Sequence, residues 1–277
     1  MRTLSKGLIA SLPVLFITAC GGGGGGSEGT SNNDSTANTG NVISIPATTQ
    51  NSDASSGHNT SQLNFNTNII VDSSDLSVSG TTKIYNYTNP QVGLFVDHHD
   101  KIELLADGKK ITLTEDFSTD FGTSYSYTLP NNASSYEFMY TRNGELVSEG
   151  SLDSLPQTFG VSGTINGEDV AITLDKSANH TYEYISEHLI CKYNVDDITA
   201  LVKSIDSRNG EGMLTGDYHK NLEQLFDITI DSLKTEFSTC SVDVDFVSES
   251  ETINRVLSSK NISIFPISTQ LSKVELF

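Results

Sequence analysis

The chain has 277 residues and a formal net charge of −19 at pH 7, because 35 Asp and Glu outnumber 16 Lys and Arg. Such an acidic surface repels the phosphates of nucleic acids, so we exclude DNA and RNA as partners. Hydrophobic residues make up 36% of the chain and Trp is absent, which predicts modest cores and one or two small domains.

The first twenty residues combine a positive start, a short apolar run and a cysteine. Arg2 and Lys6 flank the start, and the apolar stretch from Leu8 to Phe16 is too short to span a bilayer. A small residue stands directly before Cys20. This order of features predicts a secretion signal over residues 1–19, which is removed from the mature protein.

The run Ile17-Thr18-Ala19-Cys20 resembles the lipobox of bacterial lipoproteins. The resemblance implies cleavage before Cys20, followed by acylation of its thiol and of its new amino group. Gly21, in the place where an aspartate would retain a lipoprotein at the inner membrane, resembles lipoproteins sorted to the outer membrane. We therefore expect a lipid-anchored protein of the bacterial outer membrane, facing either the periplasm or the medium. The alternatives are an ordinary secretory signal with an incidental Cys20, and an uncleaved membrane helix.

Residues 20–62 are dominated by Gly, Ser, Asn and Thr. Such a stretch buries too little apolar surface to offset the entropy lost on ordering, so the sequence predicts a disordered tether. About 42 residues of flexible coil have an r.m.s. reach of roughly 35 Å. The globular part can thus stand clear of the lipid surface.

Residues 63–155 alternate apolar and polar side chains between frequent turn signals. Asp107-Gly108 and Asn143-Gly144 each separate two such runs, which is the pattern of two-residue hairpins. Short strands with turns every 8–12 residues are typical of antiparallel sandwiches. In this pattern the region resembles the immunoglobulin-like sandwiches of bacterial surface proteins, although the Cys-Trp-Cys core of true immunoglobulin domains is missing.

Residues 156–277 continue as mostly strand after a boundary at Leu155-Pro156. Apolar residues from Ile198 to Ile205 follow helical spacing, which predicts a helix. Residues 226–231 alternate apolar and polar, which predicts a strand. The fold class we predict is mainly β, with two small antiparallel sandwich-like domains, the second containing one or two short helices.

Cys191 and Cys240 are the only cysteines of the chain besides Cys20. An even pair in an exported protein predicts a disulfide, here within the second domain. A thiol nucleophile or a metal pair is the alternative, but the sequence has no CxxC and no supporting His/Cys cluster.

The segment Asp97-His98-His99-Asp100 has the residue types of a zinc or copper site. In an extended strand His98 and His99 point to opposite faces, so one ion would require a tight turn. Asp97 and His99 are therefore weak metal candidates, and we prefer a solvated polar loop.

Two further pairs of carboxylates alternate with apolar residues, Asp227 with Asp231 and Asp243 with Asp245. Calcium takes oxygen ligands of this kind, but no EF-hand loop supports it. We prefer the solvated face of a half-buried sheet. The sequence thus predicts no cofactor beyond the covalent lipid on Cys20, with calcium as the alternative.

Three Tyr-x-Tyr pairs place aromatic rings on strand faces. They are Tyr85/Tyr87, Tyr125/Tyr127 and Tyr182/Tyr184. Aromatic platforms bind sugars, so a glycan site is one interpretation, while cross-strand packing is the commoner use of such pairs.

Motifs of catalytic nucleophiles and nucleotide-binding loops are missing. The run Gly160-Val161-Ser162-Gly163 fails the GxSxG spacing because Thr164 follows it. We predict a non-enzymatic, lipid-anchored cell-envelope protein with a role in binding, adhesion or envelope assembly. Its partner would be an envelope protein or a glycan. The alternatives are a lipid-anchored hydrolase without a recognisable motif, and a calcium- or glycan-binding module.

Overall fold

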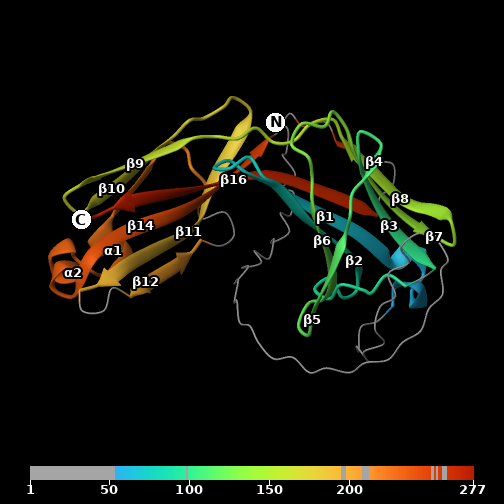
Figure 1. Ribbon diagram of the computed structural model, residues 1–277, viewed down its shortest axis with the longest axis horizontal. Coiled ribbons are helices and arrows are strands. Elements are labelled where there is room, and N and C mark those ends of the chain that lie inside the picture. Colours follow the sequence, from blue (N-terminus) through green and yellow to red (C-terminus); the bar gives the residue numbers. More distant parts are fainter. Residues whose placement is uncertain are drawn as a thin grey trace, which may run out of the picture. The chain divides into compact units, whose positions relative to one another are not determined.

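The computed structural model describes residues 54–97, 99–194, 198–207, 212–250, 253, 255–257 and 261–277. The predicted signal, Cys20 and residues 21–53 lie outside the described part. Strands dominate the rest, as the sequence predicts, and they belong to one compact unit, Asn51–Phe277 (Figure 1). Among the described residues no helix is long and apolar enough to cross a bilayer.

One eight-stranded sheet runs through this unit in the order β12-β11-β14-β16-β1-β2-β6-β5. All neighbours in it are antiparallel except β1 and β16, which are parallel. In sheet order the strands are Thr199–Asp206, His180–Tyr193, Phe237–Ser250, Ile262–Glu275, Leu63–Asp72, Val78–Asn86, Gly122–Thr128 and Thr114–Ser118.

Two smaller antiparallel sheets complete the strands. The five-stranded sheet has the order β15-β8-β7-β3-β4, with bounds Arg255–Leu257, Glu145–Leu152, Tyr136–Arg142, Asp100–Ala106 and Lys109–Lys110. The three-stranded sheet has the order β13-β10-β9, with bounds Tyr218–Asn221, Asp169–Leu174 and Val161–Asn166.

The strand β16 shows how these sheets are layered. Ile262 and Ile264 are buried with side chains of residues 63–152, whereas Val274 is buried with side chains of residues 159–246. A Cβ on Gly150 of β8 would meet Ile262 and Ile264, and one on Gly163 of β9 would meet Val274. Even-numbered residues share one face of an unbulged strand, so both smaller sheets cover the same face of the eight-stranded sheet.

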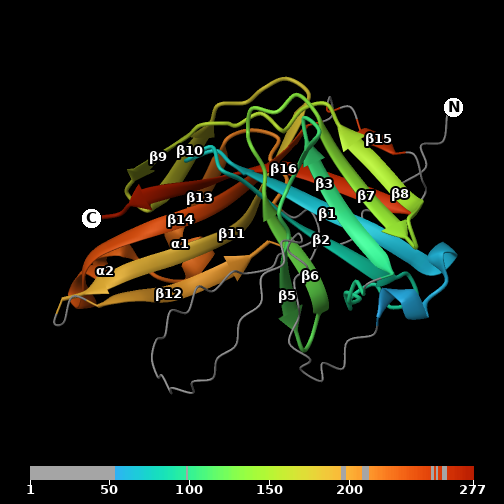
Figure 2. The same cartoon turned by 45° about the vertical axis from the view of Figure 1, so that its right-hand side comes forward.

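The two hydrophobic cores therefore lie on one face of a shared sheet. We call them the first core and the second core. The largest fully buried side chains of the first core are Phe65, Ile69, Ile84, Leu104, Tyr136, Phe138, Tyr140 and Leu152, and those of the second are Ile172, Tyr218, Phe226 and Phe246. The predicted division near residue 155 into separate domains stays a prediction. The structure adds that β16, which lies within the eight-stranded sheet (Figure 2), contributes buried side chains to both cores.

The predicted hairpins form where the turn residues indicated them. Asp107 and Gly108 have φ of 48° and 70° between β3 and β4, and Asn143 and Gly144 have φ of 51° and 81° between β7 and β8. Positive φ at both central residues gives the turn a twist that matches the flanking strands. Asp, Asn and Gly occupy these positions because they adopt the left-handed backbone conformation at a low cost in free energy.

The predicted helix near residues 198–205 is wrong, because Thr199–Asp206 is strand β12. It pairs with β11 in register, with a bulge between Leu189 and Ile190. Val202 and Ile205 pack against the second core, while Leu201 is 59% exposed. Cross-strand pairing has overridden the helical spacing, as β-branched side chains allow.

The predicted strand over residues 226–231 is also wrong, because this segment links two short helices, α1 (Leu222–Phe226) and α2 (Ile230–Glu236). The Asn221 side chain accepts a hydrogen bond from the backbone N–H of Gln224, and Thr229 caps α2 through the N–H of Ser232. Such caps satisfy backbone donors that have no partner inside a helix.

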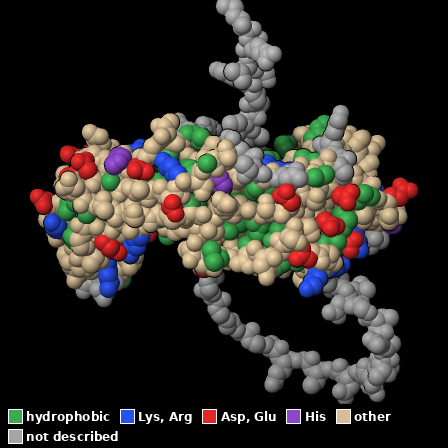
Figure 3. All heavy atoms as spheres, turned by 90° about the horizontal axis from the view of Figure 1, so that it is seen from above, with side chains coloured by type: hydrophobic (Ala, Val, Ile, Leu, Met, Phe, Trp, Pro, Cys, Tyr) green, Lys and Arg blue, Asp and Glu red, His purple; other side chains and the backbone are tan. Residues whose placement is uncertain are grey.

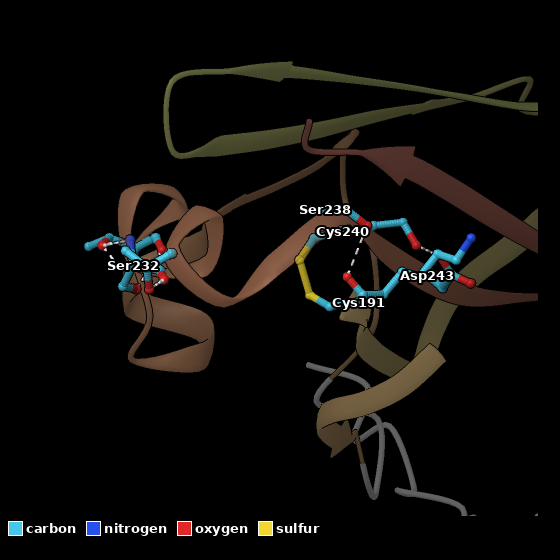
Figure 4. Close-up of a disulfide and its surroundings, with 9 residues drawn as sticks. Cys191, Ser232, Ser238, Cys240 and Asp243 are labelled. Carbon is cyan, nitrogen blue, oxygen red and sulfur yellow. Dashed lines mark hydrogen bonds between the residues drawn. A yellow bond between two sulfur atoms is a disulfide. The ribbon is translucent and has the colours of Figure 1, made fainter. Parts of the chain in front are cut away.

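The predicted disulfide between Cys191 and Cys240 is confirmed. The two residues lie directly opposite each other on β11 and β14, with Cα atoms 4.1 Å apart, and each is 1% exposed. Figure 4 shows the bond joining the two strands, with Ser238 and Asp243 nearby on β14. The bridge thus lies inside the second core.

Candidate functional site

The face of the eight-stranded sheet that points away from both cores carries many polar side chains, with the apolar Phe265, Ile267 and Leu271 of β16 among them. We call it the open face. On β16 it consists of the odd-numbered residues from Ser263 to Glu275, which are half-buried or exposed. On β1 it carries Asn64, Asn66 and Asn68, which are half-buried. Strand register therefore fixes these groups on one surface.

A row of four polar side chains crosses the open face over the second core. Ser204 of β12 lies opposite His188 of β11, which lies opposite Asp243 of β14, which lies opposite Lys273 of β16. The next row, which contains Leu189, turns into the second core. Period-two alternation thus separates the polar row from the core.

Hydrogen bonds connect this row to its neighbours. The distance from Ser204 Oγ to His188 Nδ1 is 2.9 Å, and His188 Nε2 lies 3.5 Å from Asp245 Oδ2. The Ser186 hydroxyl donates to Asp245, and Ser241 Oγ donates to Asp243 Oδ1 at 2.9 Å. The hydroxyl groups therefore hold both carboxylates in place.

Asp243 is the acid of this row, and 9% of its surface is exposed. Burial raises the pKa of its carboxyl, while the hydrogen bond from Ser241 and the charge of Lys273 oppose that shift. Lys273 is itself 2.7 Å from Glu275 Oε1, so the basic group is shared between two acids. With the neighbouring Asp245 and Glu275 included, three acids lie around one lysine, so this part of the open face carries a surplus of negative charge.

The contacts among Ser204, His188 and Asp245 have the residue types of a nucleophilic triad. A serine nucleophile also requires donors aimed at an oxyanion and a site that excludes water. Ser204 is exposed, and β11 and β14 use their backbone groups to pair with strands on both sides. The arrangement fits recognition of a polar ligand better than acyl transfer.

The metal candidates of the sequence fall in different places. Asp243 and Asp245 share the open face, but Asp227 follows α1 with φ of 58° and Asp231 lies in the first turn of α2. The expectation that Asp227 and Asp231 lie on a strand beside Asp243 and Asp245 is therefore wrong. Within the described ranges, no three His, Cys, Asp or Glu side chains are grouped to hold a metal ion. Acidic side chains are spread over the face seen in Figure 3.

The segment that contains Asp97 and His99 forms a turn bonded to the start of the described chain. Asp97 accepts hydrogen bonds from the backbone N–H of His99 at 3.0 Å and from the Ser56 hydroxyl. His98 lies outside the described residues. Asp97 thus supports the turn, and its neighbour Asp100 points inward.

Asp100 and four residues around it form a largely buried cluster that sequence reasoning missed. Arg142 donates from Nε to Asp100 Oδ1 at 2.7 Å and from Nη2 to Oδ2 at 2.9 Å. Tyr140 donates its hydroxyl to Asp100 Oδ2 at 2.6 Å, and the Ser55 hydroxyl donates to the same oxygen. Arg142 also donates to the backbone carbonyls of Ser55, at 2.7 Å, and His58, at 2.6 Å. We call Ser55, His58, Asp100, Tyr140 and Arg142 the junction cluster.

The junction cluster holds residues that the sequence assigned to the tether. Residues 54–62 form two 3₁₀ turns, Ser55–Gly57 and Thr60–Gln62, and Ser55 is fully buried. Burial alone would raise the pKa of Asp100, but hydrogen bonds from Arg142, Ser55 and Tyr140 reverse this and lower it below its usual value. The carboxylate is therefore ionised beside the guanidinium. No local sequence motif predicts the cluster, because its members come from three separate segments of the chain.

The Tyr-x-Tyr pairs are divided between the cores and the surface. Tyr125, Tyr127, Tyr182 and Tyr184 are buried. Tyr127, for example, lies 2.5 Å from the Thr67 hydroxyl, oxygen to oxygen. These four rings pack in the cores and offer no sugar platform, while Tyr87 is 54% exposed.

Comparisons with known proteins add little to this geometry. No protein-family model matches the chain, and no curated protein matches it. Among solved structures, the adhesin InvE of Yersinia pseudotuberculosis is similar over 72% of this chain, at 11% sequence identity and a TM-score of 0.22. The chain spans 58% of that adhesin's length. A likeness this weak carries no argument about function.

Proposed function

We propose that the chain is a lipid-anchored binding protein of the bacterial outer envelope, with an adhesion role and no catalytic activity. The open face is the observation that carries this proposal. It presents hydroxyl, amide and carboxylate groups at spacings set by the sheet, and its central strands are paired on both sides. Such a surface suits a partner rich in hydroxyl groups, which makes an envelope glycan the partner we favour.

Leu271 provides a way to test the open face. It lies opposite Asp245 on this face and is 49% exposed. Leu271→Arg is expected to weaken glycan binding at least about tenfold, because a long cation would obstruct the centre of the surface and pair with its carboxylates. Binding of the soluble protein to an array of bacterial envelope polysaccharides measures the effect.

Leu146→Arg is the matched control, since Leu146 is 55% exposed at the start of β8 in the five-stranded sheet. We expect it to bind as the unaltered protein does. Equal loss in both variants, or absence of any glycan ligand, would overturn the assignment of the open face. Labelling of Ser204 by a fluorophosphonate probe would instead favour the lipid-anchored hydrolase, the second candidate that the contacts of His188 support.

The lipid anchor is tested at Cys20. Cys20→Ser is expected to abolish incorporation of a fatty-acid analogue and to release the protein from the membrane fraction, because the acylated thiol is lost. Metabolic labelling followed by membrane fractionation measures both effects. Labelling of the variant at the level of the unaltered protein would refute the anchor, and protease shaving of intact cells reports the side it faces.

A further inference from the structure

The described chain enters the fold at a point held by hydrogen bonds on two sides. Ala54 forms a parallel bridge with Phe95, and the backbone N–H of Ser55 donates to Phe95 O at 2.8 Å. On the other side Arg142 donates hydrogen bonds to the backbone carbonyls of Ser55 and His58. Any pull on the preceding chain therefore reaches these bonds first.

The junction cluster connects this entry point to a different layer from the strand that follows it. Asp100 begins β3 and Arg142 ends β7, and the two lie opposite each other in the five-stranded sheet. The chain itself continues into β1, in the eight-stranded sheet. Arg142 thus links the entry segment to the layer across the first core.

We propose that the junction cluster is a mechanical lock, which passes tension on the N-terminal tether to the five-stranded sheet before β1 is loaded. The proposal rests on the proposed function, because tension arises only where a lipid anchor and a bound partner pull on the same chain. Its physical basis is the pairing of a buried carboxylate with a guanidinium that also binds two carbonyls. Charge-assisted, bidentate bonds of this kind are stronger than neutral ones.

The strand behind the lock is well suited to bear load once the lock opens. β1 pairs along most of its length with β2 on one side and with β16 on the other. A pull along its axis shears many hydrogen bonds together, whereas the nine residues from Ala54 to Gln62 have few ladder bonds of their own. The lock thus protects residues 54–62, which would otherwise detach from the fold first.

Optical tweezers test this with mature protein, Cys20→Ser, held by handles at residue 20 and at Phe277. Opening of the lock releases nine residues, which is an extension of about 30 Å at 3.3–3.6 Å per residue. In the unaltered protein this step should come at a higher force than in Arg142→Lys, which keeps the charge but loses the planar fork. Global unfolding should follow at an unchanged force in both.

Arg255→Lys is the matched control, because Arg255 belongs to the same five-stranded sheet as Arg142 and pairs near the surface with Glu249 of β14, at 2.9 Å. It should leave the early step unaltered. If Arg142→Lys does not fold, Tyr140→Phe removes one donor to Asp100 and should lower the same step by less. A step of equal force in every variant, or a variant that lowers only the global unfolding force, would overturn the lock. The measurement uses no ligand, so loss of glycan binding and loss of the lock are separate results.

Discussion

Asp100→Ala is expected to lower the free energy of unfolding by about 3–5 kcal/mol, the usual cost of removing one partner of a buried ion pair. The Asp100 side chain is fully buried and the Arg142 side chain is 15% exposed. The variant would leave the guanidinium without its counter-charge, and the hydroxyls of Ser55 and Tyr140 without their acceptor. Urea denaturation at pH 7 measures the loss.

The same pair predicts how this loss depends on pH. Because the folded-state pKa of Asp100 lies below its unfolded value, its stabilising contribution is present above the unfolded pKa, near 4. It is lost as the pH falls through the folded-state pKa. The difference between the two proteins should therefore shrink below pH 4. Asp116→Ala, at an exposed position of β5, serves as control and should change stability by no more than about 0.5 kcal/mol. A constant difference from pH 7 to pH 3 would contradict the assignment.

Replacing both Cys191 and Cys240 with alanine is expected to lower the free energy of unfolding by up to about 4 kcal/mol, the chain-entropy value for a loop of this size. The bridge spans 49 residues and joins two central strands of the second core. Thermal melting of the double variant, in the Cys20→Ser background, measures the effect.

Reduction of the unaltered protein should reproduce that shift, and reduction of the double variant should change nothing. An unchanged melting temperature in the double variant would show that strand pairing alone holds β11 to β14. Two alkylatable thiols in natively folded protein would refute the bridge itself.

Features set by local chemistry could be predicted from the sequence. The turns at Asp107-Gly108 and Asn143-Gly144 form because those residues adopt positive φ at low cost. The disulfide could be predicted because the expected export and the cysteine count leave one pairing. Alternation of Asp243 and Asp245 with apolar residues likewise indicated a sheet with one polar face.

Features set by distant partners could not be predicted. Residues 199–206 carry a helical spacing, yet an available neighbour, β11, makes them a strand. Residues 54–62 have the composition of a tether, yet Arg142, more than 80 residues further on, holds them in the fold. The sequence of residues 199–206 contains no sign of its partner β11, and that of residues 54–62 contains no sign of Arg142. The junction cluster was missed for the same reason.

The parallel pairing of β1 with β16 has a consequence for biogenesis. These strands begin at Leu63 and Ile262, so the central hydrogen bonds of the sheet join the two ends of the globular part. Contacts between such distant segments form late, because the loop-closure entropy must be overcome before they stabilise anything. The sheet therefore cannot close until β16 is available. A polypeptide that crosses a membrane from its N-terminus would leave this sheet open until β16 had also crossed.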